Sequence, residues 1–219
     1  MPASRHTRTH CSGSCRSGRK SSGFSLPDPR RQSYPAQLQK KLGTDYVVRN
    51  FGCNGASVRF DADLPYVDTM AYDESLAWNP DIVLLMLGSN DAMPWNWDSA
   101  AFRRDYERIV TSYINLPSRP RIILIAPIRM FRVMGVTFGG LSPETLEEGV
   151  RPVIREVAEE SGLQCIDLVD LFSDARYCYD GVHPNAEGVG MMAEAVFHCA
   201  ASKPRGQYRD QRRNKEVVA

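Results

Sequence analysis

Three short segments of the chain combine polar residue types in a way that ordinary turns do not require. They are residues 50–57 (Asn-Phe-Gly-Cys-Asn-Gly-Ala-Ser), residues 88–91 (Gly-Ser-Asn-Asp) and residues 180–185 (Asp-Gly-Val-His-Pro-Asn). Taken singly, each is ordinary turn chemistry, because Gly, Asn, Asp and Ser stabilise tight turns. Taken together, they supply a carboxylate, an imidazole and several hydrogen-bond donors, which are the groups that acid–base catalysis requires in one place.

Asp180 and His183 are spaced as an acid–base pair. The carboxylate can turn back onto one ring nitrogen and stabilise the imidazolium, which leaves the other nitrogen free as a general base. A serine hydroxyl needs such a base, because it is a weak nucleophile until its proton is removed. Acyl transfer also needs donors for the developing oxyanion, and a Gly N–H with an Asn amide would serve.

The apolar pattern predicts the elements that position these segments. Uninterrupted apolar runs at residues 81–87 and 121–127 indicate strands covered on both faces, and residues 46–48 and 164–168 predict two more. Helices are predicted to begin near Asp98, Ser142 and Asn185. Strands that alternate with helices predict an α/β fold, a three-layer α/β/α sandwich around a mainly parallel sheet. Functional residues in such sheets gather at the carboxyl ends of strands.

The three segments resemble, in order and approximate spacing, the motifs of the SGNH/GDSL hydrolase family. The resemblance covers roughly residues 34–201. Residues 32–38 (Gln-Ser-Tyr-Pro-Ala-Gln-Leu) also resemble the helix that follows the nucleophile loop in acetylesterase-like members. The resemblance implies a flavodoxin-like SGNH hydrolase fold.

The resemblance also implies a role for each matching residue. Gly55 and Asn90 would donate to the oxyanion, His183 would be the base and Asp180 its orienting acid. The implied activity is that of a serine ester hydrolase working through an acyl-enzyme, without metal or organic cofactor. Its implied substrates are small acyl esters, such as O-acetyl groups on carbohydrate.

The family's Gly-Asp-Ser nucleophile motif should lie upstream of Tyr34, where no intact copy is found. The nearest approximation, residues 11–18 (Cys-Ser-Gly-Ser-Cys-Arg-Ser-Gly), nominates Ser14 as the nucleophile. Rival serines are Ser12, Ser17, Ser21 and Ser22. The first strand of the fold is also poorly supported, because residues 1–12 contain no run of Val, Ile or Leu.

The composition suggests one globular domain with basic ends. We expect residues 1–22 to be disordered or not ancestral, residues 23–202 to form the hydrolase-like domain, and residues 203–219 to be a basic unstructured tail. No apolar run reaches the ~20 residues of a membrane-spanning helix, and no apolar stretch of a secretory signal is visible. The six cysteines lack paired metal spacing. We therefore expect no membrane span and no metal.

Several alternatives stay open. The degraded nucleophile motif would also fit a catalytically impaired relative that only binds a ligand or partner. The basic ends would fit an anionic surface, but the net charge of +1 argues against nucleic acid as a partner. Trp95 and Trp97 follow Asn90 closely and would either line a sugar or acyl site or pack in the interior.

Overall fold

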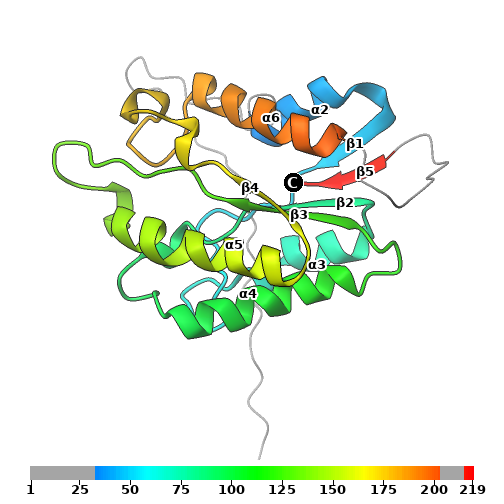
Figure 1. The fold of residues 1–219 in the computed structure, drawn as a ribbon, viewed down its shortest axis with the longest axis horizontal. Coiled ribbons are helices and arrows are strands. Elements are labelled where there is room, and N and C mark those ends of the chain that lie inside the picture. The colour runs from blue at the N-terminus through cyan, green and yellow to red at the C-terminus, as the bar shows by residue number, and fades with distance from the viewer. Residues whose placement is uncertain (1–32, 203–214) are drawn as a thin grey trace, which may run out of the picture.

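The computed structural model of the protein describes residues 33–202 and 215–219, which form a parallel sheet covered by helices on both faces (Figure 1). The 5-stranded sheet has the order β1-β5-β2-β3-β4. The strands are β1 (Tyr46–Arg49), β2 (Ile82–Leu85), β3 (Arg121–Ala126), β4 (Gln164–Asp167) and β5 (Lys215–Val218). The α-helices are α2 (Tyr34–Leu42), α3 (Met70–Ala77), α4 (Ser99–Ile114), α5 (Arg151–Glu160) and α6 (Ala186–Ala201).

Shorter helical turns connect these elements. The 3-10 turns are η1 (Gly43–Asp45), η2 (Tyr66–Asp68), η3 (Asn90–Ala92), η4 (Phe138–Gly140), η6 (Val169–Leu171) and η7 (Ala175–Tyr177). A π-helical segment, η5 (Thr145–Val150), leads directly into α5. Two of these turns, η3 and η4, lie close to the polar segments and help to position them.

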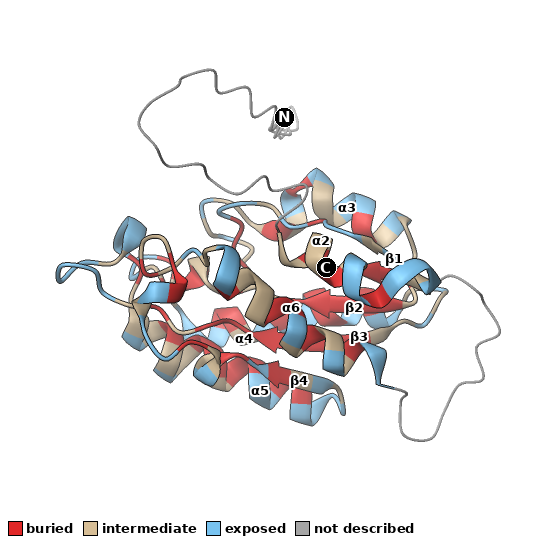
Figure 2. Ribbon diagram, turned by 90° about the horizontal axis from the view of Figure 1, so that it is seen from above, coloured by how far each residue is buried: buried red, intermediate tan, exposed pale blue. Residues whose placement is uncertain are grey.

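The core has two layers because side chains alternate along each strand. On β3, Ile122 and Leu124 pack with α4 and α5, whereas Ile123 and Ile125 pack with α2 and α6. Figure 2 shows the buried strands between helices whose outer faces are exposed. This arrangement confirms the predicted three-layer α/β/α sandwich around a parallel sheet.

The helix starts follow from capping side chains. The Asp98 carboxylate accepts a hydrogen bond from the Ala101 N–H (2.9 Å), and Asn185 accepts from the N–H groups of Glu187 and Gly188 (both 3.1 Å). Ser142 accepts from the Thr145 N–H (3.0 Å). All three helix starts were predicted from the sequence, and the cap of α6 fixes where the 180–185 segment ends.

The strand β5 lies inside the sheet, between the edge strand β1 and the central strand β2. Its Val217 pairs with Val48 on one side and with Ile82 on the other. Asp81 donates its N–H to the Glu216 carbonyl and accepts the Glu216 N–H through its side chain, both at 3.0 Å. Val217 is fully buried, so β5 is an interior strand and not an edge addition.

This position corrects one expectation. Lys215–Val218 was expected to belong to an unstructured tail, but it forms a strand. The sequence signal is weak, because only Val217 and Val218 are apolar within the strand and charged residues precede them. Parallel pairing on both sides supplies the stability that local propensity does not. The expected first strand upstream of Tyr34 lies outside the described residues.

We predict that Val217→Ala lowers the free energy of unfolding by roughly 2 kcal/mol, because it removes buried methyl groups and leaves a cavity. Val47→Ala is the matched control, since Val47 lies on the neighbouring β1 and is 38% exposed. Its effect should stay within about 0.5 kcal/mol. Urea unfolding measures both. Equal effects of the two substitutions would contradict the interior position of β5.

Candidate active site

The first two polar segments flank the carboxyl end of β5. Residues 50–57 follow β1 and residues 88–91 lie just beyond β2, and these are the two strands that pair with β5. A cavity of about 110 Å³ opens there, with Phe51, Leu87 and Ala219 among its walls. In a doubly wound sheet the carboxyl ends of strands are where ligands bind.

A direct hydrogen bond brings Asn90 to the loop that carries Gly55. The Asn90 side-chain amide donates one hydrogen bond to the carbonyl of Ala56 (2.9 Å), so its second N–H is available for a ligand. The Gly55 N–H has no hydrogen-bond partner among the described residues, and the residue is exposed. Gly55 has φ +81°, which a side chain would strain. The two donors therefore belong to one local unit.

Asp91 connects the Gly55 loop to the Asn90 loop through buried hydrogen bonds. Its carboxylate is fully buried and accepts hydrogen bonds from the Val58 N–H (2.9 Å) and the Arg59 N–H (3.0 Å). Burial raises the pKa of Asp91, an effect opposed by these backbone hydrogen bonds. No role for Asp91 was predicted from the sequence. Its place directly after Asn90, at the end of a buried strand, was the available signal.

Asp180 and His183 form the expected pair. The Asp180 Oδ2 atom lies 2.7 Å from His183 Nδ1, and Oδ1 accepts from the N–H groups of Val182 (3.0 Å) and His183 (2.8 Å). Burial works against ionisation, but hydrogen bonds from His183 and Val182 prevail and hold the pKa of Asp180 below its ordinary value. Because Nδ1 is engaged, Nε2 is the nitrogen left to exchange a proton with a ligand.

The loop that carries the pair is fixed by close packing. Gly181 has φ +85°, and a Cβ atom there would lie 2.2 Å from the carbonyl oxygen of Phe131. Only glycine fits so close an approach. The Phe131 N–H donates to the Gly181 carbonyl (2.9 Å), which ties the loop to the segment after β3. The His183 side chain is 57% exposed, so a ligand can reach it.

The turn η4 connects the pair to the donor loops. The Phe138 ring meets the His183 ring edge-on, with centroids 4.7 Å apart. A Cβ atom at Gly139 would lie 3.7 Å from the Met93 side chain, and the Ser142 N–H donates to the carbonyl of Ala92 (3.0 Å). The segment after β3 therefore spans from His183 to the residues that follow Asn90.

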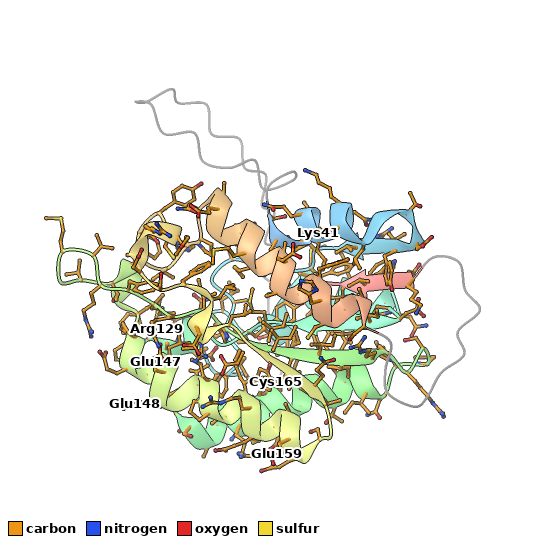
Figure 3. All side chains as sticks on the ribbon, turned by 45° about the horizontal axis from the view of Figure 1, so that its top comes forward. Lys41, Arg129, Glu147, Glu148, Glu159 and Cys165 are labelled. Atoms are coloured by element: carbon orange, nitrogen blue, oxygen red, sulfur yellow. The ribbon has the colours of Figure 1, made fainter. Side chains whose placement is uncertain are left out.

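Two ion pairs connect the beginning of the segment after β3 to the residues that lead into α5. Arg129 and Glu147 pair at 3.0 Å, and Figure 3 shows them side by side near the start of the helix α5. Arg132 makes a bidentate pair with Glu144, both bonds at 2.7 Å. In Figure 1 this segment and the loop before α6 both lie at the edge of the sheet toward which the strands point.

The structure thus joins the predicted residues in two pairs, Gly55 with Asn90 and Asp180 with His183, linked through Phe138. Ser14 and its rivals Ser12, Ser17, Ser21 and Ser22 lie outside the described residues. Within residues 33–202 and 215–219, no serine hydroxyl hydrogen-bonds the His183 ring.

The two tryptophans differ. Trp97 packs on Phe102, with ring centroids 5.4 Å apart, whereas Trp95 is 62% exposed. Trp97 is therefore a partly buried packing residue, whereas most of the Trp95 side chain faces solvent.

The described part of the chain contains neither a candidate metal site nor a candidate membrane-spanning helix. None of its groups of His, Cys, Asp and Glu side chains could hold a metal ion. None of its helices is both long enough and apolar enough to cross a membrane.

The solved structures of esterases share this fold. Est24, a carbohydrate acetylesterase from Sinorhizobium meliloti, matches with a TM-score of 0.65 at 20% identity, over 82% of this chain and 89% of its own. The M. smegmatis aryl esterase matches with a TM-score of 0.61 at 15% identity, over 78% and 85% of the two chains. At these identities the likeness concerns the fold alone.

Sequence comparison goes further. The acetylxylan esterase of Xylanibacter ruminicola is 32% identical over 194 residues, which cover 80% of this chain and 40% of that protein. The chain therefore spans less than half of the length of this relative. The model of the GDSL-like lipase/acylhydrolase family matches residues 15–190, which include both residue pairs of the site. With its motifs at the carboxyl edge of the expected sheet, the chain belongs to the GDSL-like lipase/acylhydrolase family.

Proposed function

We propose that the protein is a serine ester hydrolase that acts on small acyl esters. The observation that carries the proposal is the hydrogen bond between Asp180 Oδ2 and His183 Nδ1, made at the carboxyl edge of the sheet. It leaves Nε2 as a base, at the same edge as the two donors Gly55 and Asn90. The names of the relatives, acetylxylan esterase and carbohydrate acetylesterase, support O-acetylated carbohydrate as the substrate class.

The mechanism proceeds in two acyl transfers. His183 Nε2 takes the proton of the serine hydroxyl as its oxygen attacks the ester carbonyl, while Asp180 stabilises the imidazolium. The Gly55 N–H and the free N–H of the Asn90 amide donate to the oxyanion. His183 then returns the proton to the leaving alcohol, and an acyl-enzyme remains. Water, deprotonated by His183, releases the acid and regenerates the serine.

Ser14 is the nucleophile that we propose on the resemblance of residues 11–18 to the family motif. The family match begins at residue 15, one position after it, so the match adds nothing in its favour. The structure does not distinguish Ser14 from the alternatives Ser12, Ser17, Ser21 and Ser22, because all five lie outside the described residues. Covalent labelling discriminates among them.

A second function has one observation in its favour. No described serine hydrogen-bonds the His183 ring, and the Gly-Asp-Ser motif is degraded. A protein that binds esters without cleaving them would also show these two features. The intact Asp180–His183 pair counts against this second function, since simple binding needs no oriented base.

We predict that His183→Ala lowers kcat for aryl acetate hydrolysis by about 10²- to 10⁴-fold, the usual contribution of a general base. His198→Ala is the matched control. His198 also pairs with a carboxylate, that of Glu194 at 3.1 Å, but it lies near the other end of α6 and should leave kcat unchanged. A stopped or continuous assay of phenol release measures both variants.

Labelling with a fluorophosphonate, followed by peptide mass spectrometry, identifies the nucleophile. We expect one labelled serine in the wild type and strongly reduced labelling in His183→Ala. If the wild type hydrolyses no ester and no serine is labelled, the non-catalytic alternative holds and the esterase proposal fails.

We predict that Asp91→Ala lowers the free energy of unfolding by about 2–4 kcal/mol, because the Val58 and Arg59 N–H groups lose their buried acceptor. It should also lower kcat, since the direct hydrogen bond from Asn90 to Ala56 is then left as the main tie between the Gly55 loop and Asn90. Glu159→Ala, an exposed acid on α5, is the control and should change neither. Denaturant unfolding and the ester assay test the two effects separately, and full stability of Asp91→Ala would contradict the positioning role.

The lowered pKa of Asp180 predicts a pH dependence of stability. A carboxyl group whose pKa is lower in the folded state stabilises the fold above its unfolded value of about 3.9, and this contribution is lost as pH falls through the lowered value. The difference in free energy of unfolding between wild type and Asp180→Asn should therefore be constant near neutral pH and shrink below about pH 4. A difference that grows on acidification would refute this sign.

A further inference from the structure

Five of the eight large apolar side chains that are exposed among the described residues lie on the loop after Asn90 or on the segment after β3, whereas Val47, Met70 and Ile114 lie on β1, α3 and α4. Among the described residues, the large apolar side chains that are exposed include Trp95 (62%), Phe138 (53%), Met134 (98%) and Val136 (68%). All of these lie on the loop after Asn90 or on the segment after β3. Exposed apolar surface concentrated beside a reactive group marks a ligand-binding surface more often than chance packing. The proposed mechanism makes no use of it.

Two of these side chains, Trp95 and Phe138, lie along the turn η4, and Phe138 contacts the base. Phe138 meets the His183 ring edge-on, with an angle of 85° between the ring planes. On the other side of the turn η4, a Cβ atom at Gly140 would lie 3.8 Å from the Trp95 ring. Trp95 and Phe138 therefore border the same turn. We call these two side chains the aromatic strip.

The strip is held in place by polar contacts within the turn and around it. Thr137 donates its hydroxyl to the Leu141 carbonyl, and the Val133 and Val136 backbones exchange hydrogen bonds of 2.8 and 3.2 Å. The Trp95 indole N–H points to the Asp63 carboxylate at 3.4 Å. Because both rings are anchored and still largely exposed, their surfaces are available without rearrangement, which lowers the cost of binding.

The reaction chemistry decides which half of an ester the strip contacts. The imidazole that activates the serine also protonates the departing alcohol, so the alcohol oxygen must come within hydrogen-bond distance of His183. The acyl carbonyl points instead to Gly55 and Asn90. Since Phe138 touches the His183 ring, the strip lies on the alcohol side of the scissile bond.

The chemistry of the strip favours a sugar ring as that alcohol. A pyranose presents a face of C–H groups that packs on aromatic rings, and hydroxyl groups that need acceptors such as the Asp63 carboxylate. A long acyl or alkyl chain would instead require an enclosed apolar slot, and both rings here are more than half exposed. The Asp63 carboxylate next to Trp95 also disfavours an anionic lipid surface.

We propose that Trp95 and Phe138 form a subsite that stacks the pyranose ring of a carbohydrate ester and places its acylated hydroxyl at His183. This proposal rests on the proposed esterase function and specifies the alcohol half of its substrate. Phe138 orients the ring next to the reacting bond, and Trp95 extends the contact by one further ring position.

The kinetic test compares two acetyl esters that differ only in the alcohol, acetylated xylo-oligosaccharide and ethyl acetate. In Trp95→Ala and in Phe138→Ala, the ratio of kcat/KM for the sugar ester to that for ethyl acetate should fall about tenfold, the loss expected for one aromatic contact. Trp95→Phe and Phe138→Tyr should restore most of the ratio. Met134→Ala is the control, because Met134 is the most exposed apolar residue of the same segment but lies outside the strip.

A binding test separates this subsite from catalysis. Unacetylated xylo-oligosaccharide is titrated by calorimetry into His183→Ala and into His183→Ala/Trp95→Ala, and we expect about tenfold weaker binding by the second variant. If the wild type cleaves no ester but this difference is found, the esterase proposal fails and the subsite stands. If ethyl acetate is cleaved but the kinetic ratio and the binding are unaffected by Trp95→Ala and Phe138→Ala, the subsite is refuted and the esterase proposal stands.

Discussion

The hydrogen bonds that hold β5 between β1 and β2 are the constraint on which the geometry of the candidate site depends, at the carboxyl edge of the sheet. The Gly55 loop leaves β1 and the Asn90 loop follows β2, so the distance between the two loops is set by the strand inserted between their strands. The last contact is made at the edge itself, where the Phe51 N–H donates to the Ala219 carbonyl at 3.2 Å. This strand frames the two loops from the side of the sheet, in addition to the direct hydrogen bond from Asn90 to Ala56 and those that Asp91 accepts.

Close packing, more than charge, fixes the remaining geometry. Gly181 admits the Phe131 carbonyl where any side chain would collide, and Asp91 is buried to hold two backbone N–H groups. The exposed groups that would meet a substrate, His183, Phe138 and Trp95, are thus supported by neighbours that cannot shift without breaking buried contacts. The side chains that would meet a substrate are therefore exposed, whereas the groups that position them are buried. That division suits a reaction in which donors must be aligned before charge develops.

The features that could be predicted from the sequence are those that depend on residues close together in the chain. The Asp180–His183 pair follows from a spacing of three residues, and the sandwich follows from the long apolar runs of β2 and β3. The sequence could not predict β5, because two valines after a charged stretch carry no strand signal and the pairing is with residues far away in the chain. Nor could it predict the contact of Phe138 with His183, which depends on a turn with Gly139 at φ +64° and Gly140 at φ +76°.

The insertion of β5 also has a consequence for the newly made chain. Of the described strands, β5 is the last to be synthesised, yet it occupies an inner place in the sheet. Until it arrives, β1 and β2 each present an open edge that can pair with another chain. The interval between synthesis of β2 and of β5 is therefore one in which these unpaired edges favour aggregation, and a chaperone that shields strand edges would reduce it.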